Sequence, residues 1–275
     1  MKLALLCILA LVAFAANSVL NRAALALDQI GPAAFLAIRL VSGAAMLAVL
    51  VWVRDPARLV PKNWRGPAAL LAYMIGFSFA YLSLDTGTGA LILFGGVQIT
   101  MFAGALVTGE RPGLARWAGS ALAFAGLALL FLPGTAAPSV SGAGLMCIAA
   151  IGWGIYSLEG KGVANPLATT SANFVWAAPI GVAVWALAPS VITPLPSGIV
   201  LAIASGAITS GVGYAIWYAV LPRIDATLAA VAQLTVPIIA LGGGVLFLSE
   251  PLTWRFVVAA GLVSAGVLLA LRKPA

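Results

Sequence analysis

Aromatic side chains recur at helical spacing in the apolar segments of this sequence. Tyr73, Phe77 and Tyr81 follow one another every four residues, which puts them on one face of a helix. Such a face binds apolar groups and cations, while hydroxyl groups anchor polar ones. Helix packing or an interfacial belt is the alternative interpretation. The other aromatic residues predicted to contact a small ligand are Trp153, Tyr156, Trp176, Tyr214, Trp217 and Tyr218.

Two amides and a proline lie within these apolar segments. An amide at membrane depth is costly unless it is paired or lines a wet cavity, so Gln98 and Gln233 indicate either a bond between helices or a ligand contact. Pro237 follows Gln233 by about one helical turn and removes a backbone hydrogen bond, so a hinge is predicted there. Ser157 is a further polar residue predicted to contact the ligand.

Three cations within or near the ends of apolar segments could bind a carboxylate. Arg22 and Lys161 lie near segment ends and are the predicted contacts, although Lys161 could instead mark the end of its helix. Arg39 lies deeper, and its alternatives are snorkelling to the interface or an ion pair with Asp28.

The residue types that most enzymes need are missing or badly placed. The chain has no histidine, and Cys7 and Cys147 lie in apolar segments without ligand spacing. All seven acidic residues fall at or near segment ends, so no carboxylate is expected at mid-membrane for proton exchange. We therefore expect no catalysis, no metal site and no cofactor. A passive channel is disfavoured because a charged ring or filter-like loop is missing.

The composition predicts an all-α integral membrane protein. Hydrophobic residues make up 63% of the chain and charged residues 8%, with a mean hydropathy of +1.13, too apolar to cover a soluble globule. Apolar stretches long enough to cross a bilayer recur along its length. We predict ten transmembrane helices, at approximately 3–27, 33–53, 67–84, 88–108, 116–132, 142–162, 168–188, 198–220, 227–248 and 255–271.

Basic residues predict the orientation. The loop at 54–65 carries four of them and is therefore expected in the cytoplasm. Ten spans then put most other basic residues on the same side, together with both termini. The formal charge of +7 is explained by these loops, without a nucleic-acid partner.

An internal repeat divides the chain. A shift of 140 residues aligns Asp85 with Asp225, Gly104 with Gly244, and Glu110 with Glu250. A shift of 139 residues aligns Phe14 with Trp153 and Arg22 with Lys161. Five helices per half is an odd number, so the second half must cross the membrane in the opposite sense. The predicted domains are 1–137 and 138–275, two inverted five-helix repeats around a central cavity.

Each half carries a glutamate in the turn between its fourth and fifth helices. These are Glu110 in "TGERPG" and Glu250 in "LSEPLT". The first interpretation is a helix-start device, in which the carboxylate meets the N–H groups at the start of the following helix. A role in transport is the alternative.

The chain resembles the drug/metabolite transporter superfamily, EamA type, in its ten spans, its inverted halves and its glutamate turns followed by "GSALAFAGLALL" and "AAGLVSAGVLLAL". Its aromatic richness is similar to that of the aromatic amino-acid exporters. The resemblance implies a cavity lined by the third, fourth, eighth and ninth helices and the ends of the first and sixth, with the second helix toward the periphery.

The function expected from the resemblance is export of aromatic and other neutral amino acids by alternating access, across a bacterial inner membrane. Because mid-membrane carboxylates are missing, uniport or exchange is predicted rather than proton coupling. A drug, nucleoside or other metabolite exporter of the same superfamily is the alternative, and an integral-membrane enzyme is a remote one. The expected partners are a small-molecule substrate and membrane lipid, and the expected state is a monomer.

Overall fold

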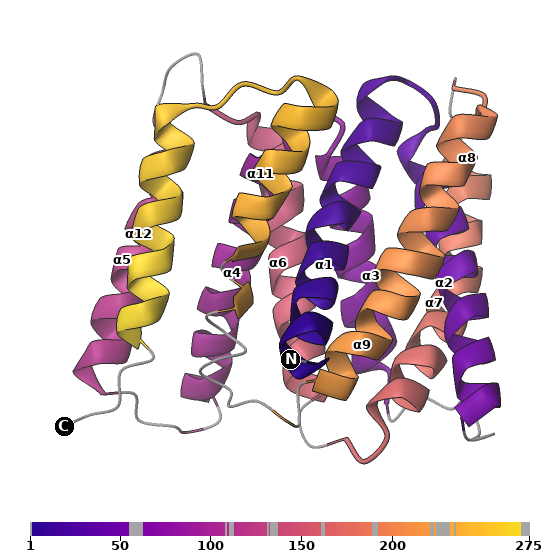
Figure 1. Cartoon of the computed structure of the whole chain (residues 1–275), viewed down its shortest axis with the longest axis horizontal. Helices are drawn as coiled ribbons and strands as arrows, with labels where there is room; N and C mark the ends of the chain where they lie inside the picture. The colour runs from indigo at the N-terminus through magenta and orange to yellow at the C-terminus, as the bar shows by residue number, and fades with distance from the viewer. Residues whose placement is uncertain are drawn as a thin grey trace.

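The computed structural model describes residues 2–54, 63–107, 109, 113–130, 132, 137–160, 163–188, 192–220, 223, 232–233 and 235–270. These residues form an all-helical bundle without strands (Figure 1). Its elements are α1 (Lys2–Ala26), α2 (Pro32–Arg54), α3 (Arg65–Ala80), α4 (Thr86–Val107), α5 (Leu114–Leu130), α6 (Val140–Gly160), α7 (Pro166–Leu187), α8 (Pro196–Ile203), the π-helical segment η1 (Ala204–Val212), α9 (Gly213–Val220), α11 (Thr235–Leu248) and α12 (Trp254–Ala270).

The described part of the chain forms ten continuous helical segments, which we call rods, because α8, η1 and α9 form one uninterrupted helix. Six rods are long and apolar enough to cross a membrane by length and composition: α1, α2, α4, α6, α7 and the rod of α8, η1 and α9. The described helices α5, α11 and α12 are apolar and have 17, 14 and 17 residues, and α3 has 16 residues. At 1.5 Å per residue, a helix of 17 residues covers roughly 25 Å, near the lower limit for a span.

The packing follows the predicted inverted repeat. The second and fifth helices of each half pack on their own counterparts, α2 on α7 and α5 on α12. The first helix of each half packs mainly on helices of the other half. The helix α6 of the second half packs against α3 and α4, and α1 of the first half packs against α9, η1 and α11. In Figure 1 α1 and α6 run in opposite directions. The fold is therefore two inverted five-helix repeats, whereas the division at residues 137 and 138 remains a prediction.

Glycines allow α5 and α12, the fifth helices of the two halves, to pack closely. A Cβ on Gly119 would collide with the Gly266 carbonyl and lie 2.6 Å from the Ala270 nitrogen. A Cβ on Gly126 would lie 3.0 Å from the Ala259 carbonyl. Shifting Gly119 by 140 residues gives Ala259, and shifting Gly126 gives Gly266. Each contact is thus the symmetry mate of the other, with backbones in close approach.

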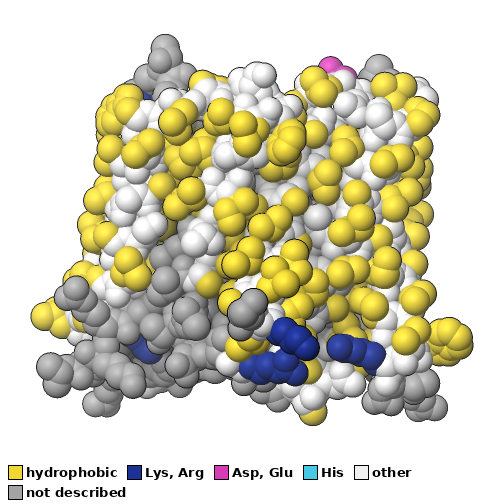
Figure 2. Space-filling view, viewed as in Figure 1, with side chains coloured by type: hydrophobic (Ala, Val, Ile, Leu, Met, Phe, Trp, Pro, Cys, Tyr) yellow, Lys and Arg dark blue, Asp and Glu magenta, His cyan; other side chains and the backbone are white. Residues whose placement is uncertain are grey.

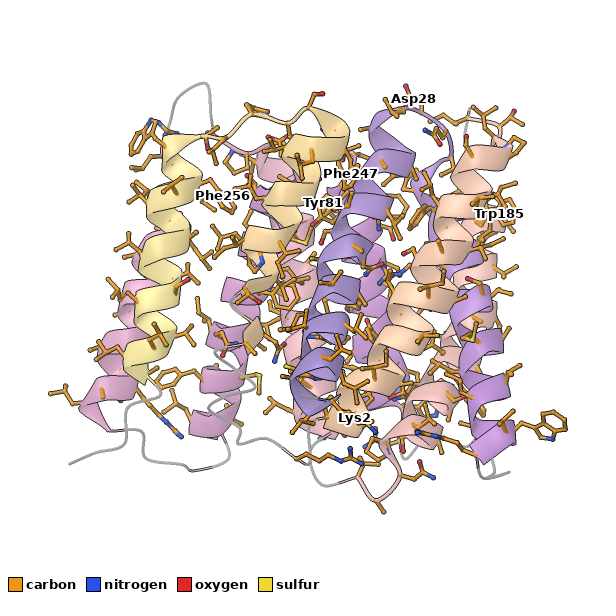
Figure 3. The ribbon with its side chains drawn as sticks, viewed as in Figure 1. Lys2, Asp28, Tyr81, Trp185, Phe247 and Phe256 are labelled. Carbon is orange, nitrogen blue, oxygen red and sulfur yellow. The ribbon has the colours of Figure 1, made fainter. Side chains whose placement is uncertain are left out.

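Several basic residues gather at one end of the bundle. Lys2, Arg54, Arg65 and Arg116 lie at the ends of α1, α2, α3 and α5 that point downward in Figure 1, which we name the basic end. Figure 2 shows basic side chains gathered there. The opposite end, named the far end, includes Asp28, and Figure 3 places it across the bundle from Lys2.

Apolar side chains cover the sides of the bundle between these ends (Figure 2). Large ones project outward, including Trp52 and Phe247, which are 73% and 77% exposed. An exposed apolar belt of this kind is what lipid tails cover.

Candidate substrate-binding site

Aromatic rings from α1, α6 and α9 meet inside the bundle. The ring of Phe14 lies 6.5 Å from that of Trp153, 5.8 Å from Tyr214 and 5.7 Å from Trp217, centroid to centroid. Trp153 also contacts Tyr214 at 5.2 Å, and all four side chains are buried. The sequence predicted three of these residues as ligand contacts but missed Phe14. Its alignment with Trp153 across the repeat was the signal that could have found it.

The stripe on α3 continues this cluster toward the far end. The Tyr73 ring lies 4.9 Å from Trp153 and 5.3 Å from Phe77, and Phe77 lies 4.9 Å from Tyr81. All three α3 side chains are buried, as four-residue spacing on an inward face requires. We call the connected rings Phe14, Tyr73, Phe77, Tyr81, Trp153, Tyr156, Tyr214 and Trp217 the aromatic ladder.

A polar network lies beside the ladder, between α1 and η1. Asn17 Nδ2 donates to Tyr73 Oη at 3.3 Å, and Asn17 Oδ1 accepts from Ser205 Oγ at 2.5 Å and from Thr209 Oγ1 at 3.1 Å. The hydroxyls come from the π-helical turns of η1, and π-helical turns are often found at functional sites. Ser205 and Thr209 were not among the residues predicted from the sequence, although the hydroxyls in "ASGAITSGV" were the available signal.

Arg39 joins this network from α2. Its side chain is 0% exposed. Its Nη2 donates to Tyr73 Oη at 3.0 Å, and Nε and Nη2 both lie 3.3 Å from Ser210 Oγ. The guanidinium carbon lies 5.0 Å from the Phe77 ring centroid and 5.5 Å from that of Tyr73. Snorkelling and an ion pair with Asp28, the two alternatives for Arg39, are wrong, because α2 turns this position toward η1 and α3. The carboxylate contact remains a prediction.

Arg22 binds groups from both halves at the far end. Its Nε donates to Glu250 Oε1 at 3.2 Å, and Nη1 donates to the Tyr81 and Leu82 carbonyls at 3.0 and 3.2 Å. Asp85 lies 3.7 Å from Nη2. The guanidinium is therefore occupied by protein groups in this conformation. We call Arg22, Asp85, Thr86 and Glu250 the far-end latch.

Glu250 caps a helix, but not the predicted one. Its Oε2 accepts from the Thr86 backbone N–H at 2.8 Å and Oε1 accepts from Thr86 Oγ1 at 3.1 Å, at the start of α4 in the other half. Its own following helix is capped by Thr253, whose hydroxyl accepts from the Phe256 N–H at 3.2 Å. The expected contact with the following helix is therefore wrong. Glu110, its counterpart, lies outside the described residues.

The end of α11 turns Glu250 away from its own helix. Ser249 is left-handed, with φ 55, and the Glu250 N–H bonds back to the Gly244 carbonyl at 3.1 Å. Such a turn closes the last carbonyls of a helix. A Cβ on Gly244 would collide with the Glu250 carboxylate, so this glycine makes room for the latch.

Pockets lie at the basic end, below the ladder. One is lined by Tyr156, Asn173, Tyr218 and neighbours from α3 and α7, and Asn173 Nδ2 donates to Tyr156 Oη at 3.4 Å. A second, of about 300 Å³, is lined by residues of α2, α7 and α9 that include Arg54, Asn165 and Tyr218. Tyr156 thus lines the first pocket and also belongs to the ladder, with its ring 5.6 Å from that of Trp153.

The remaining residues that the sequence predicted as substrate contacts or as a hinge are not part of the ladder. Trp176 is 42% exposed and packs on Trp64 at the surface, 5.2 Å between centroids. Ser157 Oγ donates to the Trp153 carbonyl of its own helix at 2.7 Å. Gln98 and Gln233 are half-buried. Pro237 lies on α11, and no contact that the structure describes tests the hinge, which remains a prediction. Lys161 lies outside the described residues.

The model of the EamA-like transporter family matches residues 1–132 and again residues 140–272. The chain belongs to this family. It is therefore a multi-pass membrane transporter, and the ladder, network and latch lie inside an EamA transporter.

Curated relatives of this EamA protein extend over nearly the whole chain. An uncharacterised protein of Pseudomonas aeruginosa is 44% identical over 268 residues, which is 97% of this chain and 93% of the relative. An uncharacterised transporter of Archaeoglobus fulgidus is 24% identical over 89% of this chain and 90% of its own. A protein of Streptantibioticus cattleyicolor named "Probable terminal-alkyne amino-acid exporter" is 27% identical over 90% of this chain and 86% of its own.

A solved crystal structure shares the fold. It superposes with a TM-score of 0.66 at 19% sequence identity, covering 95% of this chain and 97% of the other. At that identity the likeness shows the fold alone.

Proposed function

We propose that this EamA transporter exports neutral amino acids, aromatic ones included. The observation that carries the proposal is the buried ladder and its polar network, which run between the far-end latch and the basic-end pockets. Aromatic faces accept apolar side chains and an ammonium group, while amides, hydroxyls and a guanidinium accept the polar end of an amino acid. The named function of the Streptantibioticus relative supports the same substrate class.

Transport proceeds by alternating access in this proposal. The described conformation has Arg22 and Glu250 joined at 3.2 Å at the far end, whereas pockets reach Tyr156 and Tyr218 at the basic end. We assign the basic end to the cytoplasm of a bacterial inner membrane because basic residues are retained on that side. Both termini are then cytoplasmic. Release to the far side requires the far-end latch to open and the basic end to close.

Uniport or exchange is proposed rather than proton coupling. The acidic residues that the structure describes, Asp28, Asp85, Glu159 and Glu250, all lie at helix ends. The buried one, Glu250, is already engaged by Arg22 and Thr86. A proton-coupled exporter needs a carboxylate that substrate and proton can share. The gradient of the substrate itself therefore drives the flux, without a cofactor or catalysis.

A single chain is proposed to be sufficient. Both inverted repeats belong to it, so the path between them requires no second copy. The remaining partners are a small-molecule substrate and the lipid that covers the exposed apolar side chains, and nucleic acid has no part in the proposal.

Counterflow in proteoliposomes tests the proposal. Vesicles are loaded with unlabelled phenylalanine, tyrosine, threonine or methionine, and the labelled amino acid is added outside at several pH gradients. Transient accumulation that does not change with the pH gradient is expected. Accumulation that follows the pH gradient would overturn the coupling. Failure of every amino acid, with a drug or nucleoside exchanged instead, would overturn the substrate class and favour the alternative exporter.

A further inference from the structure

One nitrogen of the buried Arg39 guanidinium has no partner. Nη1 is buried and forms no hydrogen bond, while Nε and Nη2 are used by Ser210 and Tyr73. A guanidinium keeps its charge in proteins, so the burial of Arg39 places a positive charge inside the bundle. Unpaired buried donors and charges are strongly unfavourable. The site is therefore incomplete without an acceptor at Nη1.

The groups around Arg39 are neutral. Its described contacts are two hydroxyls and the faces of Tyr73 and Phe77. None of the acidic side chains that the structure describes forms an ion pair with it. Arg22 differs, because it already binds Glu250, Asp85 and two backbone carbonyls. Of these two arginines, only Arg39 has a buried nitrogen without a hydrogen bond.

A second buried polar atom without a hydrogen bond lies on the same ladder. This is Tyr214 Oη, whose ring contacts Trp153, Phe14 and Phe174. The same ladder leads from the basic-end pocket through Tyr156 and Trp153 to Tyr73, which binds Arg39. The ladder therefore links the basic-end pocket to the side chain that holds the buried positive charge.

We propose that Arg39 binds the carboxylate of the transported substrate. The inference rests on the proposed amino-acid transport and names the group that recognises the acid function. The planar guanidinium presents paired donors that match a carboxylate, and Nη1 is the one that remains available. The ring faces of Trp153 and Phe14 then hold the apolar side chain or the ammonium group. Of the three cations that the sequence suggested for a carboxylate, Arg39 takes this role instead of Arg22 and Lys161.

The test compares ligands with and without the carboxylate on the full-length protein in proteoliposomes. Phenylalanine, phenylalaninamide and phenethylamine compete against labelled phenylalanine counterflow. For the wild type, the two analogues are expected to compete at least roughly 30-fold more weakly, because a site built for an anion rejects a ligand that leaves its donor unpaired. Arg39→Gln is expected to weaken phenylalanine by a similar factor and to remove the discrimination. Arg116→Gln, the same change on the peripheral α5, is expected to keep it.

Arg39→Lys keeps the proposal falsifiable if Arg39→Gln does not fold. The lysine retains a buried charge but not the planar fork, so discrimination is expected to fall to an intermediate value in a protein that elutes and melts like the wild type. Wild-type counterflow with unchanged discrimination in a folded Arg39 variant would overturn the inference and leave amino-acid transport standing. Equal competition by all three ligands on the wild type would also overturn the inference. No counterflow of any amino acid by the wild type would overturn the proposed function, and the inference with it.

Discussion

At the scale of residues, two tryptophans that the sequence predicts equally as substrate contacts differ in burial. Trp217 is 7% exposed in the ladder against Phe14, whereas Trp176 is 42% exposed against Trp64. Both were predicted to contact substrate, since a tryptophan in an apolar helix has the same sequence signature whether it faces lipid, another helix or a cavity. The structure places one inside and one outside.

This contrast predicts the result of a matched pair of substitutions. Trp217→Ala is expected to lower the rate of amino-acid counterflow about tenfold at subsaturating substrate, because it removes a buried aromatic surface from the path. Trp176→Ala is expected to change the rate by less than about twofold, since a surface ring contributes little to a buried site. Initial rates at equal reconstituted protein provide the measurement, and equal losses in both variants would contradict the assignment.

The buried far-end latch predicts a stability difference between two carboxylates. Glu250 and Arg22 are 7% and 17% exposed, whereas Glu159 and its partner Arg65 are 22% and 80% exposed. Glu250→Gln is expected to cost about 2 kcal/mol, because a charged acceptor is removed from buried donors. Glu159→Gln is expected to cost less than about 1 kcal/mol because its pair is screened by solvent. Melting in detergent measures both, and a larger loss for Glu159→Gln would count against the latch.

At the scale of elements, glycines decide which helices can approach. Gly119 lies where α5 crosses α12, and a Cβ there would collide with the Gly266 carbonyl. Gly261 lies on α12 with nothing within 4 Å of an added Cβ. Both look equivalent in the sequence as small residues in an apolar helix, so only the packing distinguishes a required glycine from a replaceable one.

We therefore predict opposite effects on stability for two glycine-to-alanine substitutions. Gly119→Ala is expected to lower the melting temperature, since α5 and α12 must separate to admit the methyl group. Gly261→Ala is expected to raise stability by about 0.5–1 kcal/mol, because alanine loses less backbone entropy in a helix. Thermal unfolding of the two purified variants beside the wild type measures the effects. A stabilising Gly119→Ala would show that the two helices are not in close contact.

At the scale of the whole molecule, the charge distribution predicts the membrane orientation. Asn63 lies at the basic end, beside Arg65, and Asp28 lies at the far end (Figure 3). In a background in which Cys7 and Cys147 are replaced by alanine, Asp28→Cys is expected to react with an impermeant maleimide added to intact cells. Asn63→Cys is expected to react only after the membrane is opened. The reverse pattern would invert the assigned direction of export.

The sequence by itself determined the membrane environment, the helical class and the inverted repeat. Hydrophobicity over about 20 residues and a fixed shift between the halves are local or periodic signals that need no tertiary contact. It also identified the α3 stripe, because every fourth residue must share a helix face. Tertiary structure decided the rest. The direction in which Arg39 points, the helix that Glu250 caps and the side on which Trp176 lies depend on neighbours from distant helices. In an apolar sequence, lipid-facing and interior positions have the same composition, so only the packing of one helix on another separates structural from binding residues.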